Sequence, residues 1–142
     1  MNNQPKVVMG VDYGSKRVGL ALANLESRLP NPYMTIENNN LYDNIQNIIN
    51  TNNVSILVIG YPRNLNGDKT KQTIEVEEFI ATLKKQINTE IHTQDEALTS
   101  VKAEKELKSQ KKQYNKEDVD ALAATFILED WLKDNYLFRD RT

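Results

Sequence analysis

Apolar runs and turn-forming residues alternate over the first forty residues, a pattern typical of short β-strands joined by tight turns. A continuous apolar and β-branched run over residues 6–13 ends at Gly14 and predicts a buried strand. Large and small side chains then alternate over residues 18–22, so we expect a second strand that pairs with the first as an antiparallel hairpin. A third strand is expected over residues 33–37, after two proline bends, and completes a three-stranded meander.

Beyond residue 40 the apolar period changes from two to about 3.6, and helices alternate with strands. Leu41, Ile45 and Ile49 share one face of the first predicted helix, and residues 54–60 then form an apolar run typical of a parallel strand buried on both sides. The remaining expected elements are a turn-rich loop over residues 61–67, a helix over 76–87, a strand over 90–94 that runs into 95–96, a charged helix over about 100–108 and a last helix over about 116–134. The last helix is expected to bury Val119, Leu122, Ala123, Phe126, Ile127 and Trp131.

The order of these elements, βββαβαβα(α), predicts an α/β fold: a mixed five-stranded sheet, with an antiparallel meander followed by parallel strands and helices on both faces. The length of 142 residues is that of an ordinary single domain, so we expect residues 1–142 to form one domain. In such folds, functional sites gather at the carboxyl ends of the parallel strands.

Charge and composition narrow the class of protein. The net charge of −2 gives no overall field that would attract a polyanion, so any contact with nucleic acid must be local. The absence of cysteine excludes disulfides and thiolate metal sites and suits a reducing compartment. The polar N-terminus and the short apolar runs predict neither an export signal nor a membrane span, and a cytoplasmic location is therefore expected.

Three carboxylates fall at positions where the predicted fold would bring them together. Asp12 ends the first strand, Glu96 ends the last strand, and Asp120 shares the inward face of the last helix with Ala123 and Ile127. An ionised carboxylate removed from water is costly unless it is paired, hydrogen-bonded or bound to a cation. Each acid also has an ordinary alternative role: a turn residue, a helix cap, or a charge that complements a helix dipole.

Bound cations are the simplest compensation for carboxylates that converge. Without a counter-ion at least one of their pKa values would rise, whereas a bound divalent metal keeps all of them ionised. Mg²⁺ prefers oxygen ligands and retains waters while it holds substrate phosphate. Pairs of such ions catalyse phosphodiester hydrolysis in many nucleases, so hydrolysis of nucleic acid is the reaction that these acids predict.

Four ordered motifs, at residues 10–19, 59–67, 95–100 and 115–124, give the chain a family resemblance over nearly its whole length. They read Gly-Val-Asp-Tyr-Gly-Ser-Lys-Arg-Val-Gly, Ile-Gly-Tyr-Pro-Arg-Asn-Leu-Asn-Gly, Asp-Glu-Ala-Leu-Thr-Ser and Asn-Lys-Glu-Asp-Val-Asp-Ala-Leu-Ala-Ala. The chain resembles the YqgF/RuvX family of RNase H-fold proteins, pre-16S rRNA nucleases that are also described as Holliday-junction-resolvase-like. The resemblance implies an RNase H-like sheet, Mg²⁺ or Mn²⁺ as cofactor, endonuclease activity and a role in maturing the 5′ end of 16S rRNA. It also implies that Asp12, Glu96 and Asp120 are the catalytic and metal-binding acids, with Asp95 as a further candidate metal ligand.

One departure from the family pattern concerns the grip on substrate. The family motif reads Asp-Glu-Arg-Leu-Thr/Ser-Thr, and this chain has Ala97 where the arginine would offer a bidentate contact to phosphate or to a site carboxylate. Arg63, in the second motif, is a candidate to replace that contact. Other basic residues near the proposed site are Lys69, Lys71 and Lys108, although a run of charges more often forms a solvated surface than a binding patch. The residues we expect to contact nucleic acid are Lys16, Arg17, Arg63, Asn64, Lys111 and Lys112.

Three other functions compete with a ribosomal RNA nuclease. An ATPase of the actin, sugar-kinase and chaperone superfamily is disfavoured, because such proteins close two domains around the nucleotide, and the P-loop pattern is absent too. A catalytically weak RNA-binding or ribosome-assembly protein and a Holliday-junction DNA resolvase both remain open. The expected partners are nucleic acid, with precursor rRNA favoured over branched DNA, and ribosomal precursor particles; the chain itself is expected to be a monomer or a weak homodimer.

Overall fold

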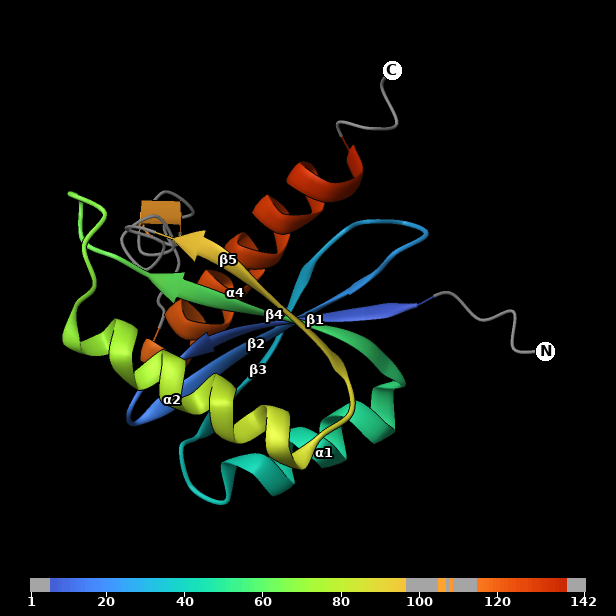
Figure 1. Cartoon of the computed structure of the whole chain (residues 1–142). Coiled ribbons are helices and arrows are strands. Elements are labelled where there is room, and N and C mark those ends of the chain that lie inside the picture. Colours follow the sequence, from blue (N-terminus) through green and yellow to red (C-terminus); the bar gives the residue numbers. More distant parts are fainter. Residues whose placement is uncertain (1–5, 97–104, 107, 109–114, 138–142) are drawn as a thin grey trace.

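The computed structural model describes residues 6–96, 105, 106, 108 and 115–137. The sheet contains β1 (Val7–Tyr13), β2 (Arg17–Asn24), β3 (Asn31–Glu37), β4 (Val54–Pro62) and β5 (Glu90–Glu96) in the order β3-β2-β1-β4-β5. β1, β2 and β3 pair antiparallel, whereas β4 is parallel to both β1 and β5. The predicted mixed five-stranded sheet is thus confirmed (Figure 1).

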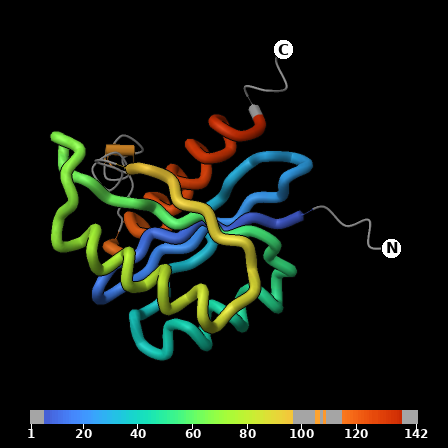
Figure 2. The backbone as a smooth tube through the Cα atoms, in the orientation of Figure 1, coloured from blue at the N-terminus to red at the C-terminus, as the bar shows by residue number. Residues whose placement is uncertain are grey.

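Helices cover both faces of the sheet, as predicted. Helices α1 (Leu41–Asn52) and α2 (Lys71–Gln86) lie on one face, and α4 (Lys116–Leu132) crosses the other and continues into a short π-helix over Lys133–Leu137 (Figure 2). Two apolar cores result, one on each face. Ile45 and Phe79 belong to the first core, whereas Leu128 and Trp131 belong to the second. Of the charged helix predicted over residues 100–108, only residues 105, 106 and 108 are described, and these are helical.

The buried face of α4 differs from the prediction. Val119, Leu122 and Phe126 are only half-buried. The buried residues of the helix are Ala121, Ala123, Ala124, Thr125, Ile127, Leu128, Trp131 and Leu132. Close backbone approach explains the difference, because a Cβ on Gly10 would lie 2.7 Å from the Ala124 carbonyl oxygen and a Cβ on Gly19 would collide with the Asp120 carbonyl. The small side chains of α4 therefore face the sheet, and several large ones turn to its flanks.

The sheet topology brings three strand ends together at one edge of the sheet. The carboxyl ends of the parallel strands β1, β4 and β5 lie at this edge, beside the first turns of α2 and α4 (Figure 1). None of the helices in the described part of the chain is long and apolar enough to cross a membrane.

Candidate active site

Strand alternation directs Asp12 and Glu96 toward the same helix. On β1, Val8 packs in the core beneath α4, so Asp12, four residues further along, also faces α4. On β5, the ring of His92 lies 5.4 Å from that of Trp131, and Glu96 is again four residues further along. Asp12 is the second-last residue of β1 and Glu96 is the last residue of β5, and both point to the side of the sheet that α4 covers.

Gly60 provides the space in which the Glu96 carboxylate lies. A Cβ on Gly60 would be 2.9 Å from Glu96 Oε1 and 2.5 Å from Ile127 Cδ1. Because β4 lies between β1 and β5, a carboxylate from β5 that rests on Gly60 is also directed toward Asp12 on β1. Any larger residue at position 60 would have to displace both Glu96 and Ile127.

Asp120 approaches the other two acids from α4. Its backbone rests on Gly19, which is the partner of Asp12 in the hairpin register. Its Oδ2 accepts a hydrogen bond of 2.6 Å from Arg17 Nε at the start of β2. The last helix therefore brings Asp120 to the Asp12 end of the hairpin, as its helical period predicted.

The electrostatics of Asp12 reflect this convergence. Burial raises the pKa of Asp12 well above its ordinary value of 3.8, and the negative charges of Glu96 and Asp120 raise it further. Asp12 keeps some solvent exposure, which is the arrangement expected for a carboxylate at the mouth of a site. The raised pKa means that the ionised form of Asp12 is disfavoured beside Glu96 and Asp120.

The three acids are near one another but not in a ligating arrangement. In the part of the chain that the structure describes, no group of three or more His, Asp or Glu side chains is placed to hold a metal ion. One reason is visible in the geometry, because Asp120 Oδ2 is engaged by Arg17. The chemistry of the donor set nevertheless fits Mg²⁺ or Mn²⁺, since all three groups offer carboxylate oxygens.

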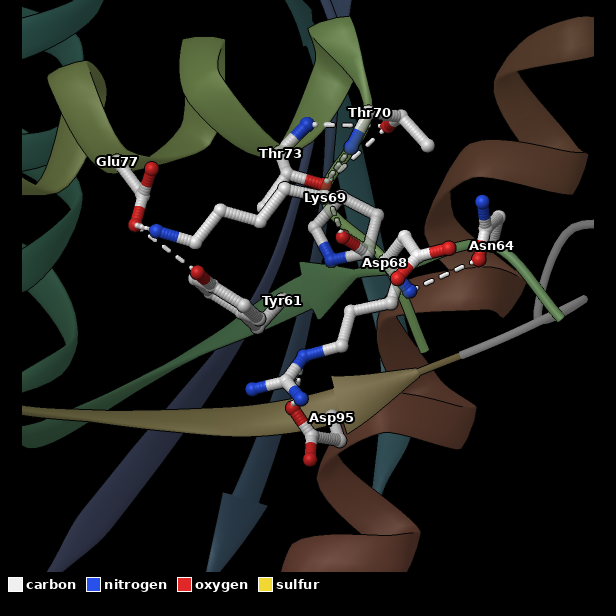
Figure 3. Close-up of polar contacts among 10 residues, drawn as sticks. Tyr61, Asn64, Asp68, Lys69, Thr70, Thr73, Glu77 and Asp95 are labelled. Atoms are coloured by element: carbon white, nitrogen blue, oxygen red, sulfur yellow. Dashed lines mark hydrogen bonds and ion pairs between the residues drawn. The ribbon is translucent and has the colours of Figure 1, made fainter. Parts of the chain in front are cut away.

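Asp95 lies apart from the three other acids. Alternation places it on the opposite face of β5 from Glu96, beside its register partner Tyr61. Arg63 Nε lies 3.5 Å from Asp95 Oδ1, and the Arg63 guanidinium stacks 5.0 Å from the centre of the Tyr61 ring (Figure 3). The predicted metal ligand Asp95 is therefore not brought together with Asp12, Glu96 and Asp120.

Asn64 organises the loop between β4 and α2. Its Oδ1 accepts hydrogen bonds from the backbone amides of Asn66 and Asp68, both at 2.9 Å. Gly67, with φ of 83°, completes the turn in a conformation that favours glycine. The side-chain oxygen of Asn64 is thus used within the loop. A contact of Asn64 with nucleic acid stays a prediction.

Helix α2 holds this loop at both ends. Thr73 Oγ1 donates a hydrogen bond of 2.5 Å to the Pro62 carbonyl. Tyr61 Oη and Lys69 Nζ both donate to Glu77 Oε2 at 2.9 Å (Figure 3). The pKa of Glu77 is lowered by its hydrogen bonds from Lys69 and then from Tyr61. The loop lines a hollow of about 410 Å³ that also contacts Glu96, so these bonds fix one wall of the site.

A second hollow, of about 550 Å³, opens on the Asp120 side. Its wall includes Lys16 and Arg17, which were predicted to contact nucleic acid, together with Lys71, which was named only as a basic residue near the site, and Lys116, which was not predicted as a contact. Lys71 and Lys116 are each the first residue of a helix, where a cation is unfavourable, and this position could have marked them as candidate contacts. Ala97 and the predicted contacts Lys111 and Lys112 lie outside the described residues.

Comparison with known proteins identifies a family and several relatives. Residues 6–134 match the family model described as "RuvX: Holliday junction resolvase". A protein of Maridesulfovibrio salexigens named "Putative pre-16S rRNA nuclease" is 36% identical over 130 residues, which cover 88% of this chain and 96% of that protein. Proteins with the same name from Crocosphaera subtropica and Rickettsia peacockii are 39% and 40% identical and cover 87% and 86% of this chain, and 90% and 82% of their own lengths.

Solved structures share the fold at low sequence identity. Thermus thermophilus RuvC in complex with a Holliday junction substrate superposes with a TM-score of 0.56 at 9% identity, over 91% of this chain and 95% of that one. The fowlpox virus resolvase in complex with substrate Holliday junction DNA gives a TM-score of 0.54 at 10% identity, over 92% and 99% of the two chains. These likenesses confirm the RNase H-like fold that the sequence predicted.

Proposed function

The chain belongs to the RuvX family, and from this membership we propose that it is a metal-dependent endonuclease that hydrolyses phosphodiester bonds. The observation that carries the proposal is the raised pKa of Asp12, whose carboxyl group lies within electrostatic reach of Glu96 and Asp120. Strongly perturbed carboxylates at the carboxyl edge of an α/β sheet are typical of active sites.

We assign the metal to Asp12, Glu96 and Asp120, because they supply the oxygen donors that Mg²⁺ and Mn²⁺ prefer. A bound divalent cation supplies a water of lowered pKa and stabilises charge at the leaving oxygen, tasks that two ions share in two-metal nucleases. The chain's own contribution is to hold three acids from separate elements at one edge of the sheet. Arg17, which donates a hydrogen bond to Asp120, lies beside Lys16 in the wall of the neighbouring hollow, where an approaching phosphate would meet both cations.

Precursor 16S rRNA is the substrate we favour, with cleavage at its 5′ end. The support is the name carried by the relatives that are 36–40% identical over most of the chain. We also propose a cytoplasmic location, contact with ribosomal precursor particles, and a monomer or weak homodimer as the active form.

Two alternatives each have an observation in their favour. The family description and the fold shared with two resolvases support a Holliday-junction DNA substrate. The Arg17–Asp120 hydrogen bond, which engages one oxygen of a proposed ligand, supports a catalytically weak RNA-binding protein.

A cleavage assay separates the three functions. The purified chain is incubated with labelled precursor 16S rRNA, a four-way DNA junction and a linear DNA duplex, each in Mg²⁺, Mn²⁺ or EDTA. The nuclease proposal expects discrete RNA cleavage that requires metal and is abolished in Asp120→Asn. Cleavage of the junction alone would favour the resolvase, and RNA binding without any cleavage would favour the assembly protein.

A further inference from the structure

A cationic hollow opens beside the proposed catalytic acid Asp120. Its volume is about 550 Å³, and Asp120 itself lines it. Lys16 from the turn between β1 and β2, Lys71 from the start of α2 and Lys116 from the start of α4 also line it. We call this hollow, with its three lysines, the lysine groove.

The lysines of the groove are available to a ligand. All three side chains are exposed, and among the described residues none of them makes an ion pair or a side-chain hydrogen bond. The acids that line the groove are Asp120, which is engaged by Arg17, and Glu75. The groove is therefore locally positive in a chain whose net charge is −2.

Two of the lysines occupy positions that their own helices disfavour. Lys71 directly follows the N-cap Thr70 of α2, and Lys116 directly follows the N-cap Asn115 of α4. A cation in the first helical turn opposes the helix dipole. Helix α2 has no acid in its first turn to offset Lys71, whereas Lys84 in its last turn is favourably placed. Local choices that oppose stability are concentrated at functional sites.

The ammonium groups, rather than the helix amides, are the free donors of the groove. The Thr73 amide is capped by Thr70 Oγ1 at 3.3 Å, and the Asp118 amide is capped by Asn115 Oδ1 at 3.0 Å. Each capping box therefore satisfies amides of its own helix. An anion in the groove would be bound by lysine side chains.

Among the described residues, the opposite side of the site has one cation in place of three free ones. Arg63 is the cationic residue that lines the hollow beside Glu96, and it is engaged by Asp95 and by the Tyr61 ring. The proposed acids thus lie between a wall with three free lysines and a wall whose arginine is already engaged.

We propose that the lysine groove binds the phosphodiester backbone of a nucleic acid strand on the Asp120 side of the bond that is cut. The inference rests on the proposed nuclease function and adds to it the position of the bound strand and two contact residues, Lys71 and Lys116. Lysines that contact phosphates confer affinity that falls steeply with salt and carries no sequence preference.

Binding to a fluorescent single-stranded RNA, measured by anisotropy in EDTA between 50 and 300 mM KCl, tests the groove. We expect the Lys71→Gln/Lys116→Gln double variant to bind about tenfold more weakly at low salt, with a log–log salt slope reduced by about 0.7 for each lysine. Lys84→Gln is the matched control, because Lys84 is an exposed lysine at the other end of α2. It should leave both affinity and slope unchanged.

Thermal melts of the same variants exclude misfolding as the cause. The Lys71→Gln/Lys116→Gln variant should maintain or raise the melting temperature although it binds RNA more weakly, whereas Lys84→Gln should maintain or lower it. An unchanged salt slope in the double variant, or an equal loss of RNA affinity in Lys84→Gln, would overturn the proposal that the lysine groove binds the strand. If the wild type cleaves RNA but the double variant keeps the wild-type salt slope, only the proposed role of the lysine groove is rejected. If RNA binding depends on the two lysines but the wild type cleaves nothing, only the nuclease proposal is rejected.

Discussion

Arg17 Nε donates a hydrogen bond of 2.6 Å to Asp120 Oδ2, and this bond joins the first hairpin to the last helix. It gives one of the three acids a cationic partner, while the pKa of Asp12 stays raised by burial and by the charges of Glu96 and Asp120. Arg17 therefore occupies a position where it competes with any metal ion for Asp120.

Replacement of Arg17 by Gln should tighten Mn²⁺ binding several-fold in the absence of nucleic acid, because the Asp120 oxygen is released. RNA binding should weaken at the same time, since a cation of the lysine groove is lost. Isothermal titration with Mn²⁺ measures the first effect. Arg17→Lys keeps the charge without the Nε donor, so its Mn²⁺ affinity should lie between those of the wild type and Arg17→Gln. A lower Mn²⁺ affinity in Arg17→Gln than in the wild type would contradict competition between Arg17 and the metal.

Asp12→Asn should stabilise the metal-free protein at neutral pH, by on the order of 1 kcal/mol. The folded state of the wild type binds the Asp12 proton more tightly than the unfolded state does, because the pKa of Asp12 is raised. Wild-type stability must therefore fall as pH rises from about 3.9 through the raised pKa, and the variant lacks this fall. Urea unfolding in EDTA across pH 4–8 measures it.

The control for this series is Asp43→Asn, which alters an exposed acid in the first turn of α1. It should lower stability slightly, because an acid there complements the helix dipole. Parallel pH curves for the wild type and Asp12→Asn would show that neither burial nor the two charged neighbours raise the pKa of Asp12.

Gly60→Ala should weaken Mn²⁺ binding and slow cleavage, because the new methyl group would contact Glu96 and Ile127. Overpacking of this kind typically costs about 1–3 kcal/mol of stability. Adding Ile127→Val should restore part of the stability, but not the metal affinity, since Glu96 stays displaced. Full Mn²⁺ affinity in Gly60→Ala would mean that the Glu96 carboxylate does not depend on the space above Gly60.

Glu77→Gln should loosen the loop between β4 and α2, because Glu77 accepts hydrogen bonds from both Tyr61 and Lys69. The lowered pKa of Glu77 means that its stabilising effect is present at neutral pH and is lost as pH falls through that pKa. Hydrogen exchange over residues 63–70 should become faster in the variant at pH 7. Glu78→Gln, which alters an exposed neighbour, is the matched control. Equal exchange in both variants would mean that the hydrogen bonds of Glu77 do not hold the loop.

The sequence predicted the acids better than the groups that surround them. Asp12 and Glu96 could be placed because each lies at the carboxyl end of a strand, and Asp120 because its helical period is regular. The Arg17–Asp120 bond could not be derived in this way, because it joins residues 103 positions apart through the packing of α4 on the hairpin. Strand alternation gives the face of the sheet on which Asp95 lies, but only once it is known which residues of β5 point toward α4.

The buried face of α4 shows the same limit. Hydrophobicity favoured Leu122 and Phe126 for burial, but contact of the helix backbone with Gly10 and Gly19 selects small residues for that face. A glycine in a strand can signal such a close approach, yet the partner segment is fixed only by the tertiary fold.

Titration of the purified protein with Mn²⁺, followed by electron paramagnetic resonance, shows whether Asp12, Glu96 and Asp120 bind a divalent metal together. Three single variants, Asp12→Asn, Glu96→Gln and Asp120→Asn, are compared with Asp95→Asn, whose side chain lies on the other face of β5. The account predicts that the wild type and Asp95→Asn bind Mn²⁺ equally, and that each of the other three loses at least about tenfold in affinity. Equal affinity in all five proteins, or a wild type that binds no Mn²⁺, would contradict it.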